Sequence, residues 1–141
     1  MVIKKELVII CPYPFDTAPS QRYRHELFLD YFYKNGVDVK IFPFLDRHTW
    51  TLLYSKHKTL DKLFGIIKGF LRRFLLLFTL RRGSIVLIHR EATPLFYPWF
   101  EWFLCKIKKT KVIYEFDDAI WLVQSDLNLA VNIFRYNQKV S

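Results

Sequence analysis

Four short segments rich in β-branched and aromatic residues recur along the chain, and each has the composition of a β-strand. They occupy residues 7–11, 37–42, 84–88 and 112–116. The first is a continuous apolar run, which is typical of a strand covered on both faces of its sheet. It stops at Pro12 and Pro14, which cannot extend a sheet, and Pro43 follows the second. We therefore predict four strands.

Apolar residues at helical spacing predict helices between these strands. Ser20 is the expected N-cap of the first helix, which ends at Asn35 and Gly36. A long helix is predicted from about Trp50 or Thr59 to Leu80. Two more helices are predicted over residues 99–107 and 124–141.

The alternation of strands and helices with short connections predicts a mostly parallel sheet with right-handed crossovers. The fold class expected is α/β, a Rossmann-like three-layer domain with strand order 2-1-3-4. A chain of 141 residues suits one such domain, so residues 1–141 are taken as a single unit. No strand follows the last predicted helix, and we expect one soon after Ser141 in any continuation of the reading frame.

Charge and composition narrow the class of protein. The net charge is +9, and residues 58–82 hold seven basic residues and one acidic, a net charge of +6. No apolar run reaches the roughly 20 residues of a membrane-spanning helix, and no signal peptide is evident, so a cytoplasmic location is expected. Cys11 and Cys105 lack the spacing of metal ligands or of a disulfide framework, so no metal is expected and both are predicted to be buried.

The long predicted helix separates basic from apolar residues. At 100° per residue, Lys62, Lys68, Arg72 and Arg73 fall on one arc, and most of the apolar residues fill the opposite side. One interpretation is a helix lying on an anionic membrane, with these four residues in contact with it. The other is a helix whose apolar side covers the sheet and whose basic side faces water.

Polar clusters follow the third and fourth predicted strands. His89, Arg90 and Glu91 come after one, and Asp117 and Asp118 come after the other. Because open parallel sheets bind ligands at the carboxyl ends of their strands, both clusters are candidates for one site. The aspartates could serve in catalysis or simply cap a turn. The other three could bind substrate or form a structural ion pair.

The start of the first predicted helix is a third candidate region. Ser20, Gln21 and Arg22 lie where backbone amides and the helix dipole favour an anion, so they are candidate substrate-binding residues. The alternative is that Ser20 only caps the helix and Arg22 faces solvent.

Three segments together carry a resemblance to a known family. They read ICPYPFDTAPSQRYRHELF, IHREATP and YEFDDAIW, in residues 10–28, 88–94 and 114–121. In this order they resemble the N-terminal domain of glycosyltransferases of the GT-B fold, in particular the group 1 or family 4 enzymes. The chain has no counterpart of the second domain of those enzymes, with its paired glutamates, nor of the glycine pair that many carry after the first strand.

The resemblance implies an incomplete half of a GT-B fold, with the C-terminal donor-binding domain absent. In that family the N-terminal domain holds the acceptor and the C-terminal domain holds a nucleotide-sugar, which is a co-substrate rather than a cofactor. Asp117 then occupies the position of a catalytic histidine in many relatives. A glycan or lipid-linked acceptor, an anionic membrane surface and a donor-binding domain or partner chain are the partners implied.

Two functions follow as hypotheses. The first is the acceptor-binding half of a glycosyltransferase that acts on a cell-envelope or polysaccharide acceptor, and that is inactive on its own. The second is a non-catalytic peripheral-membrane subunit that anchors a separate donor-binding chain. Nucleic-acid binding is disfavoured because no recognition motif is present, and a nicotinamide-dependent enzyme is disfavoured because no G-x-G-x-x-G follows the first strand.

Overall fold

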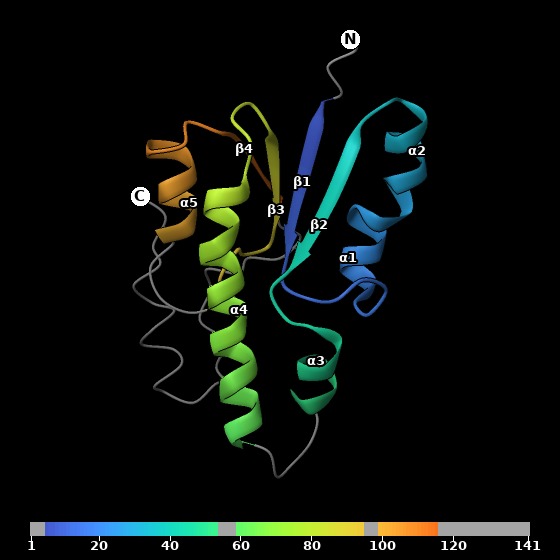
Figure 1. Cartoon of the computed structure of the whole chain (residues 1–141). Helices are drawn as coiled ribbons and strands as arrows, with labels where there is room; N and C mark the ends of the chain where they lie inside the picture. Colours follow the sequence, from blue (N-terminus) through green and yellow to red (C-terminus); the bar gives the residue numbers. More distant parts are fainter. Residues whose placement is uncertain (1–4, 54–58, 95–98, 116–141) are drawn as a thin grey trace.

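The computed structural model describes residues 5–53, 59–94 and 99–115 and contains a four-stranded parallel sheet. Its strands are β1 (Glu6–Cys11), β2 (Asp38–Pro43), β3 (Ile85–His89) and β4 (Lys111–Glu115). The order is β2-β1-β3-β4, and every neighbouring pair is parallel (Figure 1). The predicted strands, their order and their direction are therefore confirmed.

Helices cover both faces of the sheet. They are α1 (Pro19–Arg24), the 3-10 helix η1 (Glu26–Phe28), α2 (Leu29–Lys34), α3 (Arg47–Leu53), α4 (Thr59–Thr79) and α5 (Trp99–Lys106). Figure 1 shows α1 and α2 on one side of the sheet, with α4 and α5 on the other. The residues predicted for the final helix lie outside the described part of the chain.

Successive residues of β1 serve two separate cores, as the alternation of a strand requires. Val8 and Ile10 pack with Val86 and Ile88 of β3 against α4 and α5. Leu7 and Ile9 point the other way, toward the side chains of α2. The first core contains ten buried residues, namely Val8, Ile10, Leu76, Leu77, Leu80, Val86, Ile88, Ala92, Phe100 and Leu104. Two packed faces make three layers, and the domain has a Rossmann-like fold.

The first helical region differs from its prediction. Instead of one helix capped by Ser20, it contains α1, η1 and α2, with a break at His25, whose φ is −141° and ψ is −31°. The N-cap is Ala18, and Pro19 occupies the first turn. The prediction for Ser20 as N-cap is wrong because a proline, whose fixed φ suits the first helical position, begins the helix two residues earlier than predicted.

The long helix α4 packs with the opposite orientation to the one expected for a helix that covers a sheet. Its buried residues are Gly65, Gly69, Arg73, Leu76 and Leu77. Most of the apolar side is exposed, including Leu60, Leu63, Phe64, Ile67, Leu71, Phe74, Leu75 and Phe78. Gly65 lets α4 approach Thr49 of α3 closely, and Gly69 lets it approach Phe44 in the loop that follows β2. The residues of α4 that join the core against the sheet, Leu76 and Leu77, lie in its last turns.

Arg73 explains this orientation. Its guanidinium donates three hydrogen bonds, to the carbonyl oxygens of Cys11 (2.9 Å), Phe42 (2.8 Å) and Ala92 (2.8 Å). The side chain is 1% exposed, so the prediction that Arg73 contacts a membrane is wrong. These carbonyls lie at or just beyond the carboxyl ends of β1, β2 and β3. The carbonyl oxygen of Cys11 also accepts from the backbone amide of Phe44 at 2.8 Å.

The other three basic residues predicted to contact a membrane lie on the margin of α4 nearer α3. Lys68 and Arg72 both pair with Asp46, at 3.2 Å and 3.4 Å. Lys62 donates to the carbonyl oxygen of Leu53 at 3.1 Å. Their contact with a membrane stays a prediction. Within the described residues, no helix has the length and apolar content needed to cross a bilayer.

The two cysteines differ in environment. Cys11 ends β1 and is fully buried, and burial raises the pKa of its thiol to about 12. Cys105, on α5, is exposed. The prediction that both are buried is therefore correct for Cys11 and wrong for Cys105, because α5 buries Phe100 and Leu104 and turns Cys105 outward.

Candidate functional site

The candidate site lies at the carboxyl ends of β3 and β4, where parallel pairing sets His89 beside Glu115. Nδ1 of His89 lies 2.5 Å from Oε2 of Glu115. His89 is fully buried, whereas the Glu115 side chain is 26% exposed. A histidine held by a carboxylate has a fixed ring orientation, and the carboxylate in turn is held in place by the ring. Only the carboxylate of this pair faces solvent.

A second histidine completes the buried part of the site. His25, at the break between α1 and η1, is 1% exposed, and its ring meets that of His89 edge-on at 5.4 Å. Among the described residues, neither ring nitrogen of His25 has a hydrogen-bond partner, and neither has Nε2 of His89. Burial, with a smaller contribution from His89, lowers the pKa of His25 to about 4. His25 is therefore neutral at pH 7.

One basic side chain, that of Arg24, pairs with the second carboxylate oxygen of Glu115. Nη1 of Arg24 lies 3.4 Å from Oε1, and the Arg24 side chain is half exposed. The backbone amide of Arg90 donates to the carbonyl oxygen of Glu115 at 2.7 Å. Arg90 has a φ of 65°, a left-handed conformation that costs a non-glycine residue about 1 kcal/mol or more. The chain thus turns sharply after β3, and Arg90 and Glu91 are half-buried beside β4.

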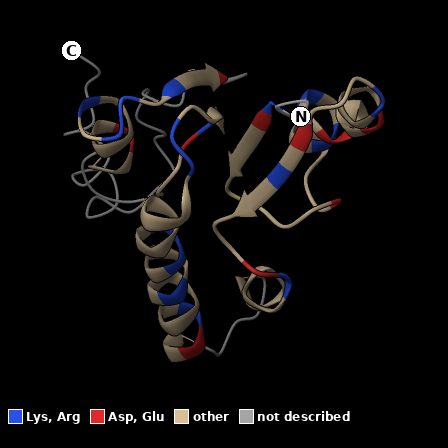
Figure 2. Ribbon diagram, turned by 45° about the horizontal axis from the view of Figure 1, so that its top comes forward, with Lys and Arg blue, Asp and Glu red and all other residues tan. Residues whose placement is uncertain are grey.

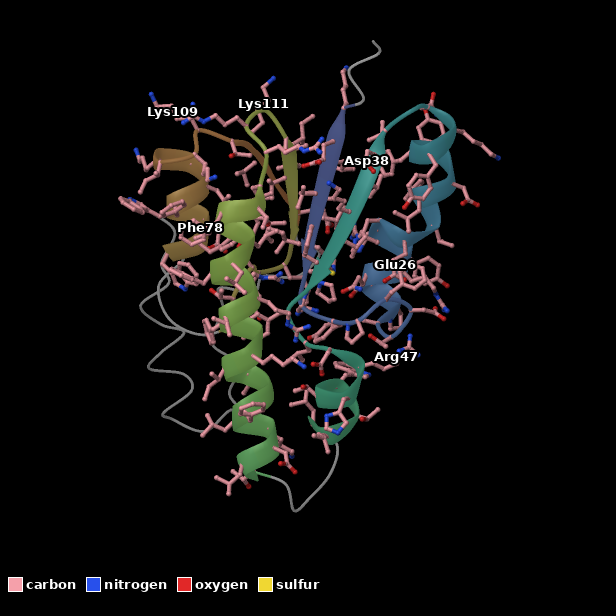
Figure 3. The ribbon with its side chains drawn as sticks, in the orientation of Figure 1. Glu26, Asp38, Arg47, Phe78, Lys109 and Lys111 are labelled. Carbon is pink, nitrogen blue, oxygen red and sulfur yellow. The ribbon has the colours of Figure 1, made fainter. Side chains whose placement is uncertain are left out.

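The structure separates the three residues predicted to bind substrate at the start of the first helix. Gln21 is fully buried. Its amide nitrogen donates to the carbonyl oxygen of Tyr13 at 3.0 Å and to Oε1 of Glu26 at 2.8 Å. Because these bonds occupy the side chain inside the loop between β1 and α1, the prediction that Gln21 binds substrate is wrong. Its contribution is to hold that loop (Figure 3, near Glu26).

Ser20 and Arg22 lie nearer the surface. Arg22 is exposed, pairs with Asp16 at 3.3 Å, and lines a shallow hollow of about 180 Å³ together with Asp16 and Pro19. Ser20 is half-buried and does not line this hollow. No observation joins these two residues to the pair of His89 and Glu115.

The structure has His89, Arg90 and Glu91 at the carboxyl end of β3, the strand end that the sequence predicted for them, and their binding of substrate stays a prediction. Sequence reasoning did not include Glu115 or His25. Glu115 is a carboxylate within a predicted strand, which is itself a signal because such a side chain is seldom left in a sheet without a partner. His25 gave no such signal, since it fell inside a region predicted as continuous helix. Asp117 and Asp118 lie outside the described residues.

The low pKa of His25 makes folding stability depend on pH. Below its ordinary pKa of 6.5, His25 takes up a proton in the unfolded chain but not in the folded one until about pH 4. The unfolded state then binds more protons, so stability falls as the pH is lowered from about 6.5 to about 4, by on the order of 3 kcal/mol, and this contribution levels off below that. Urea unfolding of the wild type and of His25→Phe at pH 7 and pH 5 measures it.

We expect the His25→Phe variant to lose less stability between these two pH values than the wild type. The same substitution at His48, which is exposed, is the matched control and should leave the pH dependence unchanged. An imidazole proton resonance of His25 that titrates near pH 6.5 would contradict the prediction.

The buried carboxylate of Glu101, on α5, holds neighbouring segments together. Its Oε1 accepts from the backbone amide of Ala92 and from the Tyr114 hydroxyl, both at 3.3 Å, and burial raises its pKa. Within residues 5–53, 59–94 and 99–115, no group of three His, Cys, Asp or Glu side chains could hold a metal ion.

Comparisons of the chain with protein-family models, with curated proteins and with solved structures found no match.

Proposed function

We propose that this chain is the acceptor-binding half of a glycosyltransferase that moves a sugar from a nucleotide-sugar to a cell-envelope or polysaccharide acceptor. The observation that carries the proposal is the pair of His89 and Glu115 at the carboxyl edge of a parallel sheet. That edge is where such sheets bind ligands, and a partly exposed carboxylate held by a buried histidine suits recognition of a hydroxyl. The likeness of the three quoted segments to GT-B enzymes supplies the reaction class.

In this proposal Glu115 contacts the acceptor. Its Oε1 accepts a hydrogen bond from an acceptor hydroxyl, and Arg24 and Arg90 supply positive charge for a phosphate-bearing acceptor. His89 is a positioning residue, because it is buried and acts through Glu115. Asp117 and Asp118 follow Glu115 in sequence and are assigned to catalysis, as a general base and as stabilisers of positive charge at the anomeric carbon. The donor nucleotide-sugar is bound mainly by a second domain or chain.

The test is sugar transfer by this chain together with its donor-binding domain or partner chain, supplied with labelled nucleotide-sugars and a cell-envelope lipid extract. Asp117→Asn should reduce transfer by about a hundredfold or more, since a positioned acid or base contributes 10²–10⁴. Glu115→Gln should reduce it by about tenfold or more, since a hydrogen bond to a charged group contributes about 1.5–3 kcal/mol. Lys111→Gln, at the exposed start of the same strand, is the matched control. Transfer that survives in both the Glu115 and the Asp117 variants would remove the site from the mechanism.

The non-catalytic alternative is supported by a different observation, the exposed apolar side of α4. In that case this chain brings a separate donor-binding chain to a membrane and takes no part in the chemistry. The Glu115→Gln, Asp117→Asn double variant distinguishes the two functions, because an anchoring subunit would keep full transfer activity in its complex. The cytoplasmic location stays a prediction.

A further inference from the structure

The exposed side of α4 is a continuous apolar ridge. Eight large apolar residues are 51–81% exposed, namely Leu60, Leu63, Phe64, Ile67, Leu71, Phe74, Leu75 and Phe78. They recur every three or four positions, so all of them lie within one side of the helix, opposite Arg73. From Leu60 to Phe78 this apolar ridge is about 27 Å long at 1.5 Å per residue. Apolar side chains scattered singly are normal on a protein surface, but a contiguous set of this size marks an interaction surface.

The apolar ridge is convex and projects from the body of the domain. Arg73 bonds to carbonyls at the carboxyl edge of the sheet, so the part of α4 that precedes it lies beyond that edge. Figure 1 shows the first half of α4 extending past the strand ends with α3 at its side, and Figure 3 shows Phe78 at the other end of the helix near α5. A projecting ridge can insert into a deformable surface, whereas a protein partner would need a groove that encloses it.

Basic residues accompany the apolar ridge. Lys68 and Arg72 line the margin nearer α3, where they pair with Asp46, and Arg81 and Arg82 follow the end of α4. In Figure 2 the blue Lys and Arg segments of α4 lie on its side toward α3. Asp46 pairs with both Lys68 and Arg72, so this margin keeps a net positive charge. Residues 58–82 carry +6, of which the buried Arg73 supplies one charge, so +5 remains apart from it. An apolar side with Lys and Arg at its margin is the pattern of a helix that lies in the interface of an anionic bilayer.

The same charge argues against the other occupants. Two copies of the chain meeting through α4 would bring two segments together that each carry +5 apart from the buried Arg73, which is repulsive. Nucleic acid would neutralise the basic residues but would leave eight large apolar side chains exposed to water. An anionic membrane neutralises the basic residues and also buries the apolar side chains.

We propose that α4 docks in the plane of an anionic membrane surface, with its apolar ridge sunk to the boundary of headgroups and acyl chains and with Lys68, Arg72, Arg81 and Arg82 at the lipid phosphates. The docked half of α4 is at the same edge of the sheet as Glu115. A lipid-linked acceptor is therefore the class of substrate that reaches the site, and this last step alone rests on the proposed function.

The test is flotation of the full chain with vesicles of phosphatidylcholine alone or mixed with phosphatidylglycerol. We expect the chain to float with the anionic vesicles and the binding to weaken at high salt. The triple variant Phe64→Ser, Ile67→Ser, Leu71→Ser removes apolar area from residues that are 55–71% exposed, so it should fold normally and bind roughly tenfold or more weakly. The matched control is Tyr23→Ser, Leu27→Ser, Tyr31→Ser, which removes residues 61–65% exposed on the other side of the sheet and should bind like the wild type.

Three outcomes count against the docking of α4 on an anionic membrane. Equal binding of the two triple variants would remove α4 as the docking element, and equal binding to neutral and anionic vesicles would remove the electrostatic part. A wild-type dimer that the α4 variant converts to a monomer, with no vesicle binding, would make a second copy the occupant. A chain that docks through α4 but supports no sugar transfer with its partner would leave the docking standing and remove the proposed function.

Discussion

Replacing Arg73 with methionine is expected to destabilise the protein by about 3–5 kcal/mol. The three carbonyl oxygens to which the guanidinium donates, those of Cys11, Phe42 and Ala92, are at 2.8–2.9 Å. Methionine fills a similar volume but donates nothing, so the carbonyls of Phe42 and Ala92 lose the Arg73 bond, and that of Cys11 keeps only the bond from the Phe44 amide. Each unsatisfied buried group costs about 1–3 kcal/mol. Urea unfolding followed by circular dichroism measures the change.

The neighbouring residue provides the control. Arg72 has the same chemistry, but its side chain is one-third exposed and it pairs with Asp46 at 3.4 Å. We expect Arg72→Met to cost less than about 1 kcal/mol, as is usual for an ion pair in contact with water. Arg73→Lys should lie between the two, because one ammonium group cannot reach three divergent carbonyls as a guanidinium does. Equal losses for Arg72→Met and Arg73→Met would refute the role given to Arg73.

Gly65→Ala is expected to destabilise the protein by about 1–3 kcal/mol, although alanine is the better helix former by about 1 kcal/mol. A Cβ at this position would lie 2.3 Å from Cγ2 and 2.5 Å from Oγ1 of Thr49 on α3. Gly69, one turn later, has the same kind of contact with the ring of Phe44, at 2.7 Å. Phe44 lies in the loop between β2 and α3, so α4 keeps its present distance from α3 and from this loop only while both positions lack side chains.

A double-mutant cycle checks the cause. Thr49→Ala removes the two atoms nearest the new Cβ and keeps the backbone hydrogen bond from Thr49 to Asp46. In this background Gly65→Ala should cost at least about 1 kcal/mol less than it does in the wild type. Additive effects of the two substitutions would show that the loss arises elsewhere than in the contact of α3 with α4.

The strands were predictable because their sequence signals are local. Each is a short β-branched or aromatic segment next to proline, glycine or polar residues, and the helices between them require parallel pairing. Which side of α4 packs against the domain was not predictable from periodicity. The pattern shows that the apolar residues share one side of the helix, but it does not show whether that side contacts the sheet. Two glycines and one buried arginine, whose partners are distant in sequence, decide it.

The edge of the sheet that carries the candidate site was predictable, but the residues that meet there were not. The position of His89 followed from the predicted end of its strand, because the direction of the chain fixes the carboxyl edge of a parallel sheet. Gln21 was misassigned because a polar residue at a helix start looks the same in sequence whether it meets a ligand or, as here, holds its own loop. Glu115 needed the register between β3 and β4, which one sequence does not supply.

Because the two cysteines differ in exposure, the folded protein presents one reactive thiol to reagents in solution. Cys11 is sealed at the end of β1 with its thiol protonated, whereas Cys105 is open to reagents on α5. An alkylating dye therefore attaches at one defined point without any engineering of the chain. Because a second thiol reacts only when the sheet opens, the number of dyes per chain also reports unfolding.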